Sequence, residues 1–324
     1  MLEKEYWYLE NSFFSWTGFK LTGDTFGGIS KIIFYLIATI IFLTMFLLWL
    51  FRDRIRKHYN RDGVNLKSRN ILIRLTGLLT IIFMVARTVV LAVYHFPKSW
   101  EILPLHFCRL MCLFVGLILL FNRIKYFRYI AFFSIFGAVL ALSMPDLVNK
   151  YQADFSGTVF GKEYIEGQIY GFAIYIDSYN YWDYIFIHSY FILISSTLMV
   201  LYPFKYKIKE FVTTVIFFSM LCLLFFVINS ITGNLAPFRW KSNYFYTGVD
   251  EVNAFSKLLP PLTRWPLMFI TEVVFGFVFV VLATLLHIAL ANVKVRFNNG
   301  IKIFSIEKEF SIKEFFGKHP KNIN

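Results

Sequence analysis

A cysteine and a histidine in separate apolar stretches of the sequence could act together as a nucleophile and a base. Cys108 lies in the run LPLHFCR, and His188 lies in a later apolar run. A thiol with its ordinary pKa of about 8.5 is mostly protonated at neutral pH, so a nucleophilic cysteine needs a base or a positive charge nearby. His188 would accept the proton, and Asp146 or His106 would orient the imidazole. The same two histidines and cysteine could instead bind a metal ion.

The spacing within this run argues against a local pair. On a regular helix His106 and Cys108 lie about 200° apart around the axis, whereas His106 and Arg109 share a face. We therefore expect the base for Cys108 to come from another helix, and His188 lies at a matching depth. Arg109 would supply positive potential to the thiolate, and Pro104 can loosen the first turn of the helix.

The composition places these residues in a membrane. The chain has 324 residues, of which 57% are hydrophobic and 16% are charged, whereas soluble proteins carry about 25% charged residues. A membrane-spanning helix needs roughly 20 apolar residues. Seven stretches meet this requirement, near 31–51, 71–95, 102–121, 129–145, 182–202, 211–232 and 265–290. We therefore predict an all-α fold, a polytopic bundle of seven transmembrane helices.

The basic residues predict the orientation of this bundle. The loops and tail on one side hold 20 Lys and Arg, and those on the other side hold 9. Because cytoplasmic loops carry the basic excess, the N-terminus is expected outside and the C-terminus in the cytoplasm of a plasma-membrane protein. The net charge of +13 then reflects topology and attraction to anionic lipid headgroups at the cytoplasmic face, and we expect no nucleic-acid partner.

The chain divides into three regions on this basis. An outer N-terminal segment covers 1–30, the transmembrane domain covers 31–290, and a basic tail covers 291–324. Two long outer loops, 146–181 and 233–264, are rich in aromatic residues and are expected to form a packed cap. In the tail, the runs VKVRF and IKIFSI flank Asn-Asn-Gly, which predicts a β-hairpin, with an irregular tail as the alternative.

The few polar residues inside the predicted helices gather near their outer ends. Ionisable residues in a membrane are costly and by default mark a site. Arg87 and Glu272 could form a structural ion pair at this depth, and Asn229 could bond between helices. The pattern predicts one polar pocket that opens towards the outer leaflet.

At these residues the sequence resembles the YwaF family of bacterial integral membrane proteins, which is related to the eukaryotic transmembrane protein 164. The shared motifs are LPLHFC (103–108), FGAVLALSMPDL (136–147), YIFIHSYF (184–191), VINSITGN (227–234), the pair Asn243-Tyr244, and Arg264-Trp265-Pro266. The resemblance implies an acyltransferase that moves fatty acyl chains between lipids through a Cys and a His. These positions match Cys108 and His188. Arg109 departs from the family pattern, which has a smaller or acidic residue after the cysteine.

Three classes of function follow. The first is a Cys-dependent acyltransferase that acts on phospholipid or lipoprotein acyl chains at the outer leaflet, with no metal or other cofactor. The second is a zinc-dependent lipid hydrolase with ligands among His95, His106, His188 and Asp146, although the H-x-x-x-H pair expected of such families is missing. The third is a non-enzymatic lipid-binding, transport or sensor protein. For the first class we assign catalysis to Cys108, His188, His106 and Asp146, and substrate binding to Arg87, Arg109, Asn229, Asn243, Tyr244 and Glu272.

Overall fold

The structure is a computed structural model of the chain. It describes residues 2–10, 12–14, 27–60, 66–96, 98–145, 147–249, 262, 264–298, 301–306 and 310–317. Asp146, one of the residues assigned to catalysis, lies outside the described residues.

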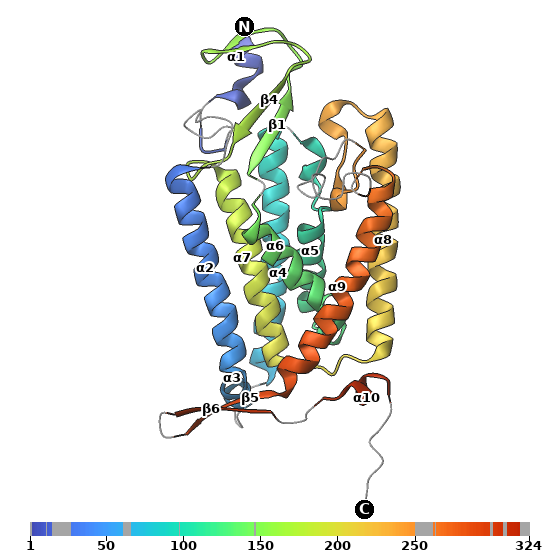
Figure 1. Cartoon of the computed structure of the whole chain (residues 1–324). Coiled ribbons are helices and arrows are strands. Elements are labelled where there is room, and N and C mark those ends of the chain that lie inside the picture. Colours follow the sequence, from blue (N-terminus) through green and yellow to red (C-terminus); the bar gives the residue numbers. More distant parts are fainter. Residues whose placement is uncertain are drawn as a thin grey trace, which may run out of the picture.

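Long apolar helices run alongside one another and form a single bundle (Figure 1). They are α2 (Gly28–Leu50), α4 (Leu66–Val93), α5 (Phe107–Leu120), α6 (Ala131–Ser143), α7 (Tyr179–Leu201), α8 (Ile208–Leu235) and α9 (Leu267–Asn292). Within the described residues, six helices are long and apolar enough to cross a membrane, when α5 is counted with the short helix η2 (Ser99–Ile102) before it. These findings confirm a polytopic helical bundle.

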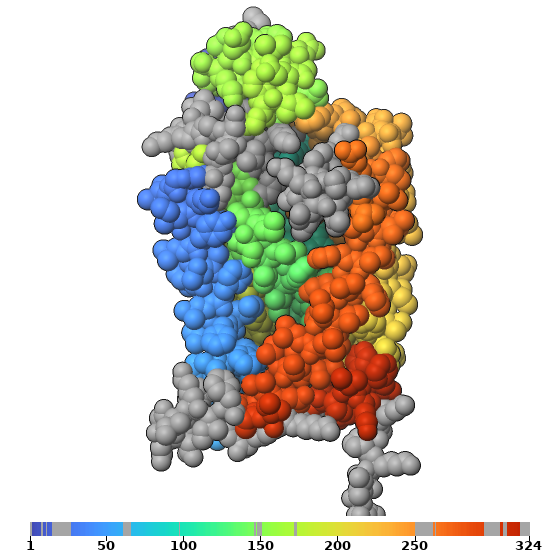
Figure 2. Space-filling view, viewed as in Figure 1, coloured from blue at the N-terminus to red at the C-terminus, as the bar shows by residue number. Residues whose placement is uncertain are grey.

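The predicted fourth span is shorter than expected. Helix α6 has 13 residues, fewer than the roughly 20 that a membrane span needs. It starts only after the 3-10 segment η3 (Ile124–Tyr129) and ends before Pro145, and the residue before a proline disfavours the helical conformation. Seven spanning helices are therefore not confirmed. Helix α6 packs against α5 and α7, and it is visible in green between α2 and α9 (Figure 2).

Two features of the packing position the helices around α5. Helix α7 is the most buried of the candidate spans, because its side chains contact neighbours on several sides. Helices α4 and α5 touch through their backbones at Gly77, where a Cβ atom would lie 2.6 Å from the carbonyl oxygen of Gly116. No larger residue fits at position 77 without separating the two helices.

A small β-structure projects from one end of the bundle, together with α1 (Leu2–Glu5) (Figure 1). Strand β1 (Val148–Gln152) pairs antiparallel with β4 (Ile169–Ala173), and β2 (Gly157–Val159) pairs antiparallel with β3 (Lys162–Tyr164). Buried aromatic and aliphatic side chains hold it together: Leu9, Tyr151, Phe155, Val159 and Tyr164. This part of the loop 146–181 is therefore packed, as the sequence indicated. We call this end of the bundle the head end.

The opposite end, which we call the tail end, carries the short helix α3 (Arg52–Tyr59) and the C-terminal elements (Figure 1). Strands β5 (Val293–Asn298) and β6 (Ile301–Ile306) pair antiparallel and confirm the predicted hairpin. Helix α10 (Ile312–Phe315) follows. Helices α1 and α10 thus lie at opposite ends of the bundle, and the side of the membrane that each end faces stays a prediction from the charges.

Candidate functional site

The segment before α5 is not a regular helix. After η2 the chain runs through Pro104 in non-helical conformations, and α5 begins at Phe107 with His106 as its N-cap at φ −61°, ψ 145°. The expected span 102–121 corresponds to the candidate span Ser99–Leu120, but its helix is continuous only from Phe107. His106 and Arg109 therefore do not share a helical face. Proline fixes its own φ and restricts the residue before it, which explains the break. Cys108 is left in the first turn of α5, at the head end.

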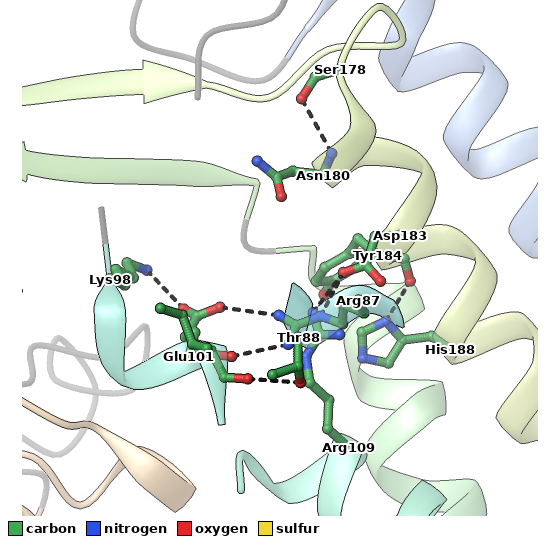
Figure 3. A network of polar contacts seen from close by, with 11 residues as sticks. Arg87, Thr88, Lys98, Glu101, Arg109, Ser178, Asn180, Asp183, Tyr184 and His188 are labelled. Atoms are coloured by element: carbon green, nitrogen blue, oxygen red, sulfur yellow. Dashed lines mark hydrogen bonds and ion pairs between the residues drawn. The ribbon is translucent and has the colours of Figure 1, made fainter. Parts of the chain in front are cut away.

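Three charged residues from three helices form a buried cluster beside Cys108. Asp183 of α7 accepts hydrogen bonds at Oδ2 from Arg87 Nε of α4 (3.1 Å) and from Arg109 Nη2 of α5 (2.9 Å). The exposed fraction of the side chain is 1% for Arg87, 3% for Asp183 and 13% for Arg109. Figure 3 shows the two guanidinium groups reaching this carboxylate. A buried cluster of this kind stabilises the fold only while every charge has its partner.

Glu101 extends this cluster into η2. Arg87 Nη1 donates to the backbone oxygen of Glu101 at 2.9 Å, and Arg87 Nη2 lies 4.0 Å from Glu101 Oε2. Thr88 Oγ1 donates to the backbone oxygen of Ile102 at 3.0 Å, so α4 holds η2 at both positions (Figure 3). The ion pair expected between Arg87 and Glu272 is therefore wrong. The sequence predicts that Arg87 and Glu272 lie at the same depth in the membrane, but the partners of Arg87 lie on α7 and η2.

Two atoms of the cluster have no hydrogen-bond partner. Asp183 Oδ1 and Arg109 Nη1 are both buried and lack a partner among the described residues. Leaving a buried polar group unpaired costs about 1–3 kcal/mol, and more for a charged group. Such atoms in a native structure need an explanation, and a bound water or ligand is the usual one.

His188 lies next to this cluster on α7, and its exposed fraction is 7% (Figure 3). Its Nδ1 lies 2.7 Å from the backbone oxygen of Tyr184. A carbonyl can only accept, so Nδ1 carries the proton and a neutral imidazole keeps its lone pair at Nε2. Nε2 has no hydrogen-bond partner within the described part of the chain. His188 also interacts electrostatically with Arg109, Asp183 and His106.

Cys108 has a free, buried thiol. Its Sγ faces α6, where a Cβ atom added to Gly137 would lie 3.2 Å from the sulfur. Tyr184, one turn before His188, donates from its hydroxyl to the backbone oxygen of Ala141 on the same helix α6 at 2.9 Å. Helix α6 thus contacts both helices that carry the predicted nucleophile and base. The thiol is not hydrogen-bonded to His188 or to any other described residue.

His106 lies among aromatic rings. Its ring centroid is 6.0 Å from that of Trp100 and 4.9 Å from that of Tyr246. Tyr244 continues this group, because its ring lies 5.1 Å from Trp100 and its hydroxyl donates to the Trp100 backbone oxygen at 2.7 Å. Burial raises the pKa of Tyr244 to about 12, so it remains a neutral donor.

Asn229 of α8 holds the segment that carries these tyrosines. Its Nδ2 donates to the backbone oxygen of Tyr244 (2.7 Å) and to Thr247 Oγ1 (2.8 Å). Its Oδ1 accepts from Ser242 Oγ (2.8 Å) and from the Tyr244 N–H (3.1 Å). With all four bonds made, Asn229 fixes the helix η5 (Tyr244–Tyr246) against α8. It lies within the bundle with no polar atom left over for another partner.

The other predicted binding residues have separate places. Asn243 precedes η5, and its Oδ1 accepts from the Gly248 N–H at 2.8 Å. Glu272 lies on α9. Within the described residues no group of three or more His, Cys, Asp or Glu side chains is placed to hold a metal ion.

Sequence reasoning did not assign Asp183 or Glu101 to the site. Asp183 lies in the first two turns of the fifth predicted helix, but its depth alone does not indicate that it meets Arg87 and Arg109. Glu101 lies in a predicted loop, and nothing in the sequence indicates that η2 packs back against Arg87. One sequence signal could have assigned Asp183 to the site: two arginines within the predicted helices, Arg87 and Arg109, each need a buried carboxylate.

Comparison with known proteins places the chain in a family. The family model described as the TMEM164 family matches residues 25–284, which include α2 to α8 and most of α9. No curated protein and no solved structure matches the chain. Because the matched region covers most of the sequence and contains Cys108, His188 and the buried cluster, this multi-span helical membrane protein belongs to the TMEM164 family.

Proposed function

We propose that the chain is a membrane-embedded acyltransferase in which Cys108 is the nucleophile and His188 is the base. The observation that carries the proposal is the hydrogen bond from His188 Nδ1 to the backbone oxygen of Tyr184. It fixes the tautomer whose Nε2 lone pair can accept a proton. The geometry supports this role because the lone pair lies at the same end of the bundle as the thiol.

The reaction would proceed in two balanced steps. In the first, Cys108 Sγ attacks the ester carbonyl of a phospholipid, and its proton passes to His188 Nε2. The carbon–oxygen bond of the ester breaks, and the leaving alkoxide takes that proton, so that an acyl thioester and a lysolipid result. In the second, the oxygen of an acceptor hydroxyl attacks the thioester, and its proton passes through His188 Nε2 to the departing thiolate.

The start of α5 supports this chemistry. The N–H groups of Phe107, Cys108 and Arg109 have no acceptor among the described residues, and the N-cap His106 makes no side-chain cap. Free N–H groups at a helix N-terminus stabilise negative charge. They would donate to the oxyanion of the tetrahedral intermediate, in the way that an oxyanion hole does.

Burial would protect the intermediate. The exposed fraction of Cys108 is 8%, and η2, η5 and the surrounding rings lie over the start of α5. Excluding water from the thioester favours transfer to a bound acceptor over hydrolysis. We propose that donor and acceptor are phospholipids or lipid-linked molecules in the outer leaflet of the plasma membrane, and that anionic headgroups attract the basic tail end at the cytoplasmic face.

The test is acyl transfer by the purified chain in lipid nanodiscs. The donor is a phospholipid with a radiolabelled acyl chain, and the acceptor is an added lysophospholipid. We expect Cys108→Ala and His188→Gln each to lower the transfer rate by at least about 100-fold, the effect typical of losing a nucleophile or a general base. Cys222→Ala is the matched control, because Cys222 is also buried and unbonded but lies on α8. Transfer by Cys108→Ala at the wild-type rate would contradict the proposal.

A further inference from the structure

The two unpartnered atoms of the buried cluster differ in what they need. Asp183 Oδ1 is a carboxylate oxygen and needs a hydrogen-bond donor, whereas Arg109 Nη1 is a guanidinium nitrogen and needs an acceptor. Their residues are joined at 2.9 Å through Asp183 Oδ2 and Arg109 Nη2. A hydroxyl group both donates and accepts, so it has the chemistry that these two atoms need. We propose that Asp183 and Arg109 bind the hydroxyl of an alcohol that serves as the acyl acceptor, an inference that rests on the proposed function.

The charges of the cluster favour a neutral ligand group. Arg87 and Arg109 carry two positive charges, and Asp183 and Glu101 carry two negative ones. Lys98 adds a third positive charge at 3.7 Å from Glu101, but its side chain is 27% exposed, so solvent screens that charge. An added phosphate or ammonium would leave one net charge in a buried site, and burying an uncompensated charge is costly. A hydroxyl completes the hydrogen bonds without changing this balance.

The position of Arg109 indicates how such a group would enter and react. The side chain of Arg109 is 13% exposed and that of Asp183 is 3% exposed, so entry would be from the Arg109 side and would require this side chain to move. Arg109 directly follows Cys108 in the first turn of α5. A hydroxyl held there would lie near the turn of α5 that carries the thioester on Cys108, and His188, next to the cluster, would take its proton during attack.

Binding is measured first in Cys108→Ala, which removes the proposed nucleophile. The probes are 1-O-hexadecylglycerol and 1-O-hexadecyl-2,3-di-O-methylglycerol, two lipids of similar size of which only the first can donate a hydrogen bond. In nanodiscs we expect the free glycerol ether to bind about tenfold more tightly than its dimethyl ether, because a hydrogen bond to a charged group is lost in the latter.

Arg109→Lys, added to this background, tests the assignment. Lysine keeps the positive charge for Asp183 but has only one nitrogen. Because the oxygen of either lipid can accept from Arg109 Nη1, we expect both lipids to bind about tenfold less tightly. Arg128→Lys is the matched control: Arg128 lies in η3, beyond the far end of α5, and pairs with Glu210 at 3.3 Å, so both affinities should be unchanged.

With Cys108 intact, Arg109→Lys should raise the KM for 1-O-hexadecylglycerol about tenfold, whereas Arg128→Lys should leave that KM within about twofold of the wild-type value. Equal binding of the two lipids, or unchanged affinities in Arg109→Lys, would overturn the inference and leave a buried water as the partner of these atoms. Binding is measured in a variant that lacks the thiol. If this variant prefers the free glycerol ether but the wild-type protein transfers no acyl group, the proposed function is refuted and the binding site stands.

Discussion

The most buried arginines at the two ends of the bundle have different kinds of partner. At the tail end, Arg52 Nη1 donates to the backbone oxygen of Trp49 at 3.0 Å, and its Nη2 donates to those of Leu290 and Val293. These carbonyls belong to the last turn of α2 and the end of α9, where helices leave oxygens without internal partners. Arg52 therefore ties helix ends together, which is a structural role.

At the head end the arginines meet a carboxylate instead. Arg87 and Arg109 both donate to a single oxygen of Asp183, and one atom of Asp183 and one of Arg109 are left unpaired. Burial of an arginine side chain therefore does not by itself identify a functional site. Arg69 Nε, near the start of α4, is also buried and unpartnered. What distinguishes the head end is that its incomplete ion cluster includes Arg109, which follows Cys108 in α5, and lies next to His188 with its free lone pair.

Asp183→Ala should have the largest effect. It leaves Arg87 and Arg109 buried without their carboxylate, and breaking a buried ion pair costs about 3–5 kcal/mol. We expect a large drop in the melting temperature of the protein in nanodiscs and no detectable acyl transfer. A variant that melts within about 2 °C of the wild type would show that the head end does not depend on this cluster.

Gly137→Ala should disturb the thiol without touching a charge. The new Cβ would lie 2.5 Å from the Phe107 ring and 3.2 Å from Cys108 Sγ, and overpacking of this kind costs about 1–3 kcal/mol. We expect the transfer rate per folded protein to fall at least tenfold.

The matched control for this variant is Gly116→Ala, two turns after Cys108 on α5, whose Cβ would lie 2.9 Å from the Ile81 side chain. It should lower stability by a similar amount and leave the rate per folded protein within about twofold. If both variants lower the rate equally, the position of Cys108 is not what the first one changes.

Arg52→Met should separate structure from activity at the tail end. It removes charge-assisted hydrogen bonds to helix-end carbonyls but keeps much of the packing of the side chain, so we expect a loss of about 1.5–3 kcal/mol in the free energy of unfolding. Acyl transfer per folded protein should be unchanged. A selective loss of transfer would remove the distinction between the two ends.

Glu314→Gln should have the smallest effect and should depend on pH. The pKa of Glu314 is lowered because its carboxylate accepts a hydrogen bond from the Ser311 backbone N–H and interacts with Lys205. A lowered folded-state pKa means that the stabilisation is complete above the ordinary value of 4.5 and is lost as pH falls through the folded-state pKa.

Because this pair is exposed, the loss should be under about 1 kcal/mol. Melting curves should therefore differ slightly at pH 7 and coincide at pH 3, whereas Lys313→Gln, next to Glu314 in α10, should match the wild type at both. A difference between Glu314→Gln and wild type that persists at pH 3 would point to another cause.

The sequence predicted well how deep residues lie along the helices, but it predicted poorly which side chains contact each other. Apolar length located the long helices, and the Asn-Asn-Gly run located the hairpin, because both signals are local. The shortening of α6 and the break before Phe107 depend on how Pro145 and Pro104 act within their surroundings, which hydropathy does not report. The partner of Arg87 was wrong for a related reason: residues at one depth can lie on helices that do not face each other, and only packing decides which pairs meet.

The most direct test of the account is the state of Cys108 after incubation with donor alone. The purified chain in nanodiscs is mixed with a phospholipid of defined acyl chain, and the reaction is quenched in acid. The protein is then digested, and the mass of the peptide that contains Cys108 is measured by mass spectrometry. The account predicts one acyl group on this cysteine, released by neutral hydroxylamine as a thioester is, and no acyl group on Cys222. An unmodified Cys108 in a preparation that still transfers acyl chains to an added acceptor would contradict it.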